Sequence, residues 1–243
     1  MPEPGIGESP MPRRNRSAAA ALGFAALLAA APAGAQTLTL GSAAPVTTID
    51  PHFHNVGPNN ALTMHIFDRL VERDGRARPR PSLAESWRVV SERVWEFKLR
   101  PNVTWHDGRP FTADDVVFTF SRVPNVANSP GGFQGFLRAI ERVEVVDPLT
   151  LRLHTRAPHP LMPLDLASVS IISRHAAEGA ATEDFNSGRA AIGTGPYRLV
   201  SYRSGDRIEM TRNDAYFGGA EPWARVSYRI VNNDAARTAA LLA

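Results

Sequence analysis

His52 and His54 are the two histidines whose type and spacing could bind a metal ion. One residue separates them, Asp50 precedes them, and His65 is the next histidine along the chain. In a strand, His52 and His54 would point to the same side, as paired zinc ligands can. No cysteine is available to complete such a site. A polar loop explains these residues better than a metal site does. The alternative interpretation is a secreted metal-binding or hydrolytic protein that uses His52, His54 and His65.

The sequence lacks the motifs of several common enzyme classes. It contains no cysteine nucleophile, no Gly-x-Ser-x-Gly turn, no His-Glu-x-x-His zinc helix and no Gly-Lys-Ser/Thr phosphate loop. His106 beside Asp107 could act as a base and its orienting group, but a tight turn explains both residues. Asp114 and Asp115 could be paired carboxylates, but helix capping explains them better. We therefore expect no enzyme activity, no catalytic residue, no bound metal and no cofactor.

The composition is that of a globular protein without disulfides. The 243 residues are 43% hydrophobic and 21% charged, which is enough apolar material for a sizeable core. The net charge is only +3, and Lys98 is the single lysine. Because the arginines are spread along the chain and form no basic patch, we expect no nucleic-acid partner.

Residues 1–35 have the pattern of a secretory signal peptide. Three arginines precede an uncharged run: Arg13, Arg14 and Arg16. The run Ala18–Ala31 is mostly alanine and too short for a membrane span, and Ala33–Ala35 offers a small-x-small cleavage site. Translation could start at Met1 or at Met11. We expect residues 36–243 to form the exported protein.

The rest of the chain mixes short strands with helices. Apolar residues at helical spacing predict a helix over Asn60–Arg69, and Thr112 with Asp115 predicts a capping box that starts another. Alternating or β-rich runs predict strands over 36–41, 86–90, 94–99, 140–146, 149–155, 169–172, 197–202, 208–212 and 225–231. The last helix, predicted over 234–242 with Asp234 as its cap, has no stop signal, so we expect the chain to be truncated. This mixture favours an α/β or α+β fold.

Two glycine-containing segments are interpreted as turns. Trp105-His106-Asp107-Gly108 is typical of a tight turn. Gly193-Thr194-Gly195-Pro196 resembles a phosphate loop only superficially, because Pro196 lacks an amide proton and no lysine follows. We expect it to bend the chain before a strand.

Several segments, in the same order along the chain, resemble the family 5 extracellular solute-binding proteins of ABC importers. They are Ile49-Asp50-Pro51-His52, residues 82–87 (SLAESW), residues 97–100 (FKLR), residues 103–118 (VTWHDGRPFTADDVVF), residues 193–197 (GTGPY) and residues 212–218 (RNDAYFG). The resemblance covers nearly all of residues 38–243. It does not depend on any single motif.

This resemblance implies an α/β fold like that of type II periplasmic binding proteins, in which two lobes close on a solute. Family members are considerably longer, so residues 36–243 would form the N-terminal lobe with its extra subdomain, and the second lobe would be missing. The implied function is that of a monomeric periplasmic subunit that binds oligopeptides, dipeptides or a related solute such as a nickel chelate. The implied partners are the permease subunits of the importer. A non-functional truncated remnant is the other alternative.

By position in the family, first-lobe contacts with the ligand would come from three loops. The residues that this implies are His54, Asn55, Asn60, Phe133, Phe136 and Ser168. The asparagine and histidine side chains would supply hydrogen-bond donors and acceptors, and the two phenylalanines a flat apolar wall. The acidic residue that pairs with a peptide's amino group in relatives would lie in the missing half.

Overall fold

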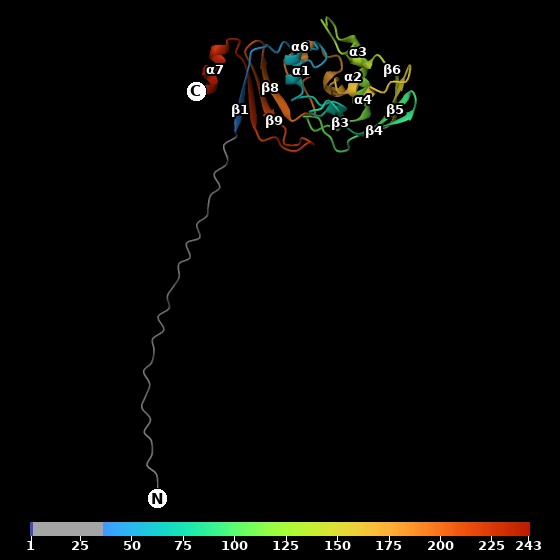
Figure 1. Cartoon of the computed structure of the whole chain (residues 1–243), viewed down its shortest axis with the longest axis horizontal. Coiled ribbons are helices and arrows are strands. Elements are labelled where there is room, and N and C mark those ends of the chain that lie inside the picture. Colours follow the sequence, from blue (N-terminus) through green and yellow to red (C-terminus); the bar gives the residue numbers. More distant parts are fainter. Residues whose placement is uncertain (2–35) are drawn as a thin grey trace. The chain divides into compact units, whose positions relative to one another are not determined.

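The computed structural model describes Met1 and residues 36–243, so the predicted signal peptide lies outside the described residues. Residues 36–243 form one compact unit (Figure 1). The strands of the described part are β1 Thr37–Ser42, β2 Val71–Arg73, β3 Pro79–Pro81, β4 Ala84–Ser91, β5 Val94–Leu99, β6 Ile140–Asp147, β7 Thr150–Thr155, β8 Tyr197–Arg203, β9 Arg207–Arg212 and β10 Arg225–Ile230. The helices are α1 Gly57–Thr63, α2 Ala113–Arg122, η1 Val123–Asn125, α3 Gln134–Leu137, α4 Met162–Leu166, α5 Arg174–Ala177, α6 Thr182–Asn186 and α7 Asp234–Leu242.

Two four-stranded sheets organise these elements. One has the order β1-β10-β9-β8, with β1 parallel to β10 and the other neighbours antiparallel. The other has the order β4-β5-β7-β6 and is antiparallel throughout. The sheets lie at opposite ends of the folded unit, with α1, α2 and α4 between them (Figure 1). None of the helices in the described part is long and apolar enough to cross a bilayer.

Each sheet has its own hydrophobic core. Phe97, Leu151 and Leu153 of the β4-β5-β7-β6 sheet are fully buried against Trp105 and Val116. The core of the other sheet includes Ile208, Met210 and Val226, together with Leu62, Ile66, Phe67 and Phe185. Burial of apolar surface stabilises a fold by about 25 cal/mol per Å², so these two cores are the main force that holds the sheets and helices together.

The outer face of the β4-β5-β7-β6 sheet carries a row of alternating charges. Arg88, Glu96, Arg152 and Glu144 occupy paired positions across the four strands. Glu96 accepts hydrogen bonds from Arg88 at 2.7 Å and from Arg152 at 2.9 Å. Because this face is polar and the opposite face is apolar, only one face of the sheet packs on the core.

Helix α1 begins at Gly57, three residues before the predicted start at Asn60, and it ends at Thr63 instead of Arg69. Pro58 suits the first turn of a helix, where its missing amide proton costs nothing. Beyond Thr63, the carbonyl groups of His65 and Ile66 accept hydrogen bonds from Tyr197 at 2.9 Å and Gly195 at 2.9 Å. Tertiary contacts therefore take the carbonyls that a longer helix would use.

The predicted strand at 169–172 was wrong. Ser170 makes only an isolated bridge with Arg69. The amide of Ile171 donates to the Asp68 carbonyl at 2.8 Å, and the amide of Ile172 donates to the Thr119 hydroxyl at 3.1 Å. These single partners satisfy the segment's backbone groups, so it needs no strand neighbour.

The cap of α7 was also misplaced by one residue. Asn233, not Asp234, accepts the capping hydrogen bond, from the amide of Ala236 at 2.9 Å. The predicted strands that correspond to β1, β4 to β7 and β8 to β10, and the start of α2, are confirmed to within about two residues. The Asp115 carboxylate accepts the backbone amide of Thr112 at 3.0 Å, as the capping box predicts.

Gly193 and Gly195 bring two distant segments into contact. A Cβ at Gly193 would lie 1.7 Å from the Ile66 carbonyl oxygen, and a Cβ at Gly195 would lie 2.7 Å from the Ile66 carbonyl carbon. The glycines are therefore required by a close approach of two backbones, whereas the sequence suggested a need for turn geometry. Gly108 does have a positive φ, 86°, in the tight turn predicted at 105–108.

Candidate functional site

Five of the six predicted contact residues line one pocket of about 390 Å³. They are Asn55, Asn60, Phe133, Phe136 and Ser168, and they come from α1 and the loop before it, from α3 and the residue before it, and from the loop after α4. The pocket lies where α1, whose Leu62 belongs to the β8–β10 core, meets segments of the other core. The fold thus brings together residues that are more than 100 positions apart.

His54 is the predicted residue that does not line this pocket. Its backbone forms a parallel bridge with Gly131, and the next amide, that of Asn55, donates to the Gly131 carbonyl at 2.8 Å. This pairing, with a hydrogen bond from the Ser129 hydroxyl to the Phe53 carbonyl, fixes the loop that presents Asn55. His54 therefore contributes through its backbone to the placement of its neighbour.

Asn55 and Asn60 form a polar pair at the pocket. Asn60 Nδ2 donates to Asn55 Oδ1 at 2.8 Å. Within the part of the chain that the structure describes, neither Asn55 Nδ2 nor Asn60 Oδ1 has a side-chain hydrogen bond. The amide nitrogen of Asn55 and the amide oxygen of Asn60 thus remain available as donor and acceptor, which is what a peptide group needs.

Phe133 and Phe136 form the apolar part of the lining, with ring centroids 6.3 Å apart. Phe133 is only 4% exposed and packs in the core, where its ring also meets that of His52 edge-on. Phe136 is half-buried and packs against the same core. The apolar wall is therefore anchored, and Phe136 is its accessible member.

The sequence did not predict the charged residues of this pocket. Arg69, Glu72 and Arg73 also line it. Arg73 donates to the Leu164 carbonyl at 2.7 Å and to the Ser168 hydroxyl at 2.9 Å. These residues lie at and after the expected end of a helix, where charges are usually interpreted as a solvated face. No pattern in the sequence distinguishes them from such a face.

The alternative use of His52 as a metal ligand conflicts with its surroundings. His52 Nε2 contacts the Ser170 carbonyl at 2.8 Å, and Nδ1 contacts the Arg122 guanidinium at 3.0 Å. Since a carbonyl only accepts and a guanidinium only donates, Nε2 carries the proton and Nδ1 accepts. Both ring nitrogens are thus occupied, and burial lowers the pKa of His52 to about 4. Among the residues described, no group of three potential metal ligands occurs.

Arg122 and Asp50 hold the segment that leads into the pocket. Arg122 forms a two-pronged ion pair with the Asp50 carboxylate at 2.6 and 3.0 Å, and the Thr182 hydroxyl donates to the same carboxylate at 2.9 Å. Burial alone would raise the pKa of Asp50, but the hydrogen bonds and charge of Arg122 outweigh it and lower the pKa. The Asp50-Pro51 turn is therefore a scaffold element.

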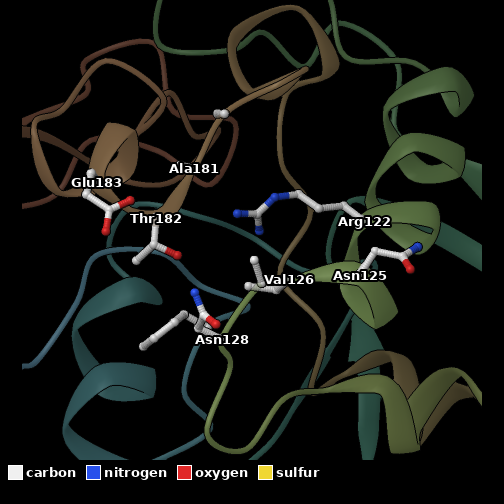
Figure 2. A pocket seen from close by; sticks show the side chains of 10 residues that line it. Arg122, Asn125, Val126, Asn128, Ala181, Thr182 and Glu183 are labelled. Carbon is white, nitrogen blue, oxygen red and sulfur yellow. The ribbon is translucent and has the colours of Figure 1, made fainter.

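A second pocket, of about 370 Å³, adjoins this ion pair. Figure 2 shows Arg122 extending from the end of α2 toward Thr182, with Asn125 at the end of η1 and Val126 and Asn128 on the loop that follows. Asp50 already neutralises Arg122, so the remaining charged residue of this second pocket is the exposed Glu183, and none of the predicted contact residues lines it. The pocket of Asn55 and Asn60 is the better candidate for binding a solute.

The family is settled by a sequence comparison. The model of the family described as "Bacterial extracellular solute-binding proteins, family 5 Middle" matches residues 78–243. The chain belongs to this family. The two sheets and mixed helices correspond to part of the type II periplasmic binding protein fold of family 5.

Similar family 5 proteins include binders of different solutes. The dipeptide-binding protein of Escherichia coli K12 is 32% identical over 224 residues, which cover 81% of this chain and 41% of the relative. MoaA of A. tumefaciens R10, solved with mannopinic acid, is 32% identical, with a TM-score of 0.76 over 85% of this chain and 43% of that one. NikZ of Campylobacter jejuni, solved with Ni(L-His), is 26% identical, with a TM-score of 0.76 over 85% and 41%. The chain thus spans less than half the length of these relatives.

Proposed function

We propose that this family 5 chain is the solute-binding component of an ABC importer. In this proposal, the pocket of Asn55, Asn60, Phe133, Phe136 and Ser168 holds one side of a peptide or of a related solute such as a metal chelate. The observation that carries the proposal is the convergence of these residues on one pocket. His54 is retained only as a backbone support for the loop that bears Asn55.

The chemistry of the pocket supports a peptide as the first choice. The free donor of Asn55 and the free acceptor of Asn60 can pair with a peptide group, and Phe136 offers an apolar surface to a side chain. A pocket that covers a ligand from one side leaves the other side in water, so each hydrogen bond contributes little net free energy. We therefore expect weak binding by this lobe and tight binding only when a second lobe covers the solute.

The proposal extends to location and partners. Family 5 proteins are described as extracellular. We propose that residues 1–35 direct export, that the exported chain is a periplasmic monomer, and that it delivers its solute to permease subunits. Fusing residues 1–35 to a reporter enzyme that is active only after export tests the first step: activity would support export, and retention in the cytoplasm would contradict it.

Thermal unfolding with a panel of solutes tests the binding function. The panel contains dipeptides, tripeptides and Ni(L-His), each at millimolar concentration. A peptide that binds the native chain raises Tm by mass action, and the Asn55→Ala variant should lose most of that rise. Asn125→Ala is the matched control, because Asn125 is an exposed asparagine that lines the second pocket.

Two outcomes would overturn the assignment of the site. A peptide-induced rise that Asn125→Ala abolishes and Asn55→Ala preserves would move the site to the second pocket. A rise caused by Ni(L-His) alone, with no response to any peptide, would replace the peptide with a chelate as the cargo.

A further inference from the structure

Arg69 is a buried cation that has almost no partner among the described residues. It is 9% exposed, and it lines the pocket of Asn55 and Asn60. Its Nε atom is buried and has no hydrogen-bond partner in the described part of the chain. The closest carboxylate oxygen, on Glu72, lies 3.8 Å from Nη1, beyond hydrogen-bond distance. A buried guanidinium with unmet donors is costly, so its presence calls for a partner from outside the chain.

The backbone holds Arg69 in place. Its carbonyl accepts the amide of Leu83 at 3.1 Å, and its backbone bridges Ser170. Asp68, the preceding residue, is not its partner, because its two carboxylate oxygens accept the hydroxyls of Thr194 at 2.8 Å and Tyr216 at 3.2 Å. The guanidinium is thus fixed beside the pocket while the nearby acid is occupied elsewhere.

The other charges of the pocket leave it positive. Arg73 is a second cation in the lining, and Glu72 is the one acidic residue among the lining residues. Arg73 spends two donors on the Leu164 carbonyl and the Ser168 hydroxyl, whereas Arg69 spends none on a hydrogen bond within the described residues. Arg69 is therefore the cation with capacity left for a ligand.

We propose that Arg69 binds a carboxylate group of the solute. This inference rests on the proposed function, since it assigns a chemical class to the ligand of that same pocket. A guanidinium matches a carboxylate in plane and can donate two parallel hydrogen bonds. With Asn55 and Asn60 pairing a peptide group of the ligand and Arg69 its carboxylate, the pocket selects small peptides or acylated amino acids with a free acid group.

A titration with two matched peptides tests this assignment. N-acetyl-Ala-Phe and its C-terminal amide differ only in the carboxylate, and both can be added to the ¹⁵N-labelled chain while the amide of Asn55 and the Nε–H of Arg69 are followed by NMR. We expect the acid to bind at least about tenfold more tightly than the amide and to shift the Arg69 Nε–H signal. In Arg69→Gln the preference should vanish, whereas Arg93→Gln, which changes an exposed arginine outside the pocket, should keep it.

The outcomes separate this inference from the proposed function. Equal binding of acid and amide at Asn55 would overturn the role of Arg69 and leave the solute-binding function standing. A lack of any shift at Asn55 with either peptide would overturn the peptide site itself. Inorganic phosphate that displaces the acid peptide and binds more tightly would replace the carboxylate with a tetrahedral oxyanion.

Stability gives an independent readout for Arg69. Because its charge is buried without a hydrogen bond, Arg69→Gln should leave Tm unchanged or raise it, as removal of uncompensated buried charges can. A marked fall in Tm would mean that Arg69 stabilises the fold. That result would contradict the proposal that it is held for a ligand.

Discussion

Scaffold and site separate clearly at the residue scale, and Gly195 and Asn55 represent the two. A Cβ on Gly195 would meet the backbone of His65 and Ile66 at 2.7 to 2.8 Å, and neither backbone can yield without loss of its own hydrogen bonds. Gly195→Ala should therefore destabilise the fold by about 2 kcal/mol or more. Asn55 is exposed and its side chain bonds only Asn60, so Asn55→Ala should change stability by about 0.5 kcal/mol at most. Calorimetry on both variants checks this, and the reverse order of effects would show that scaffold and site are interchanged.

Two buried histidines should make the fold sensitive to acid. His106 Nε2 contacts the Gly195 carbonyl at 3.0 Å, and its Nδ1 accepts the Gly193 amide at 3.2 Å, so it is held neutral just as His52 is. Burial lowers the pKa of each histidine to about 4. The unfolded chain binds these protons near pH 6.5, so the stabilisation is complete above that pH and is lost as pH falls toward 4.

The pKa shift of Asp68 partly offsets the loss of stability that the two histidines cause in acid. Burial raises its pKa to about 6, so the folded chain holds this proton more tightly than the unfolded chain does. The Asp68 contribution therefore decreases stability as pH rises from about 4 to about 6. Two histidines outweigh one aspartate, and we expect the free energy of unfolding to fall between pH 6.5 and 4.

The His106→Gln variant isolates one of these contributions. A glutamine amide can donate to Gly195 and accept from Gly193 without titrating. Between pH 7.5 and 5, the variant should lose about 2 kcal/mol less stability than the natural chain, at about 1.4 kcal/mol per pKa unit. Urea unfolding at the two pH values measures this. An identical loss of stability in the variant and the natural chain would contradict this assignment. The Asp68→Asn variant should lose more stability than the natural chain over the same pH range, because it lacks the opposing contribution of Asp68.

At the scale of elements, the N-terminus of α2 connects the two cores. The Asp115 carboxylate accepts the amides of Thr112 and Arg174 at 3.0 and 2.9 Å and the indole N–H of Trp105 at 3.3 Å. Asp115→Ala should thus lower stability by about 2 kcal/mol, since it leaves buried donors unpaired. Asp114→Ala is the matched control, because Asp114 is exposed in the same helical turn and should cost less than about 1 kcal/mol. Equal losses in thermal unfolding would mean that only charge at the helix end matters.

Local patterns predicted the elements whose order is set by neighbours in sequence. The β4–β5 and β6–β7 hairpins pair residues that alternate in the sequence, and the register matches Trp87 with Phe97 and Val145 with Leu151. The start of α2 follows from its own capping residues. Helix α1 and the segment 169–172 were mispredicted because their ends are fixed by Gly195, Asp68 and Thr119, which are distant in sequence.

The site shows the same division between local and distant information. Of the six residues that the family resemblance implied, five line one pocket and His54 does not, and contact with a ligand stays a prediction for all of them. Arg69 gave no signal in the sequence, because the burial of its guanidinium without a hydrogen bond depends on where the backbone contacts with Leu83 and Ser170 place it. Only the three-dimensional structure identifies a buried guanidinium that makes no hydrogen bond within the described residues.

Across the whole molecule, the proposed pocket forms one wall of a binding site. The similar proteins are more than twice as long as the region that matches this chain. The pocket lies between α1 and segments that pack on the core of the β4-β5-β7-β6 sheet. Burial from a second side would exclude water from the hydrogen bonds of Asn55 and Asn60 and strengthen them. This lobe alone should therefore bind peptides with millimolar affinity at best.

Covering the pocket should be what produces tight binding. When this chain is mixed with the second lobe of a family 5 relative, an increase of at least about tenfold in peptide affinity by calorimetry would support the account. An affinity that stays equal to that of this chain alone would mean that the pocket gains nothing from a second wall.

The most direct test is to map where peptides touch this chain. An equimolar mixture of dipeptides and tripeptides, titrated into the ¹⁵N-labelled protein, should shift the amide signals of Asn55, Asn60, Phe136 and Ser168 together, with one saturation curve. Shifts centred on Phe53 and Thr182, which line the second pocket, or on Val117 and Ile140, which line a groove beside α2, would contradict the account.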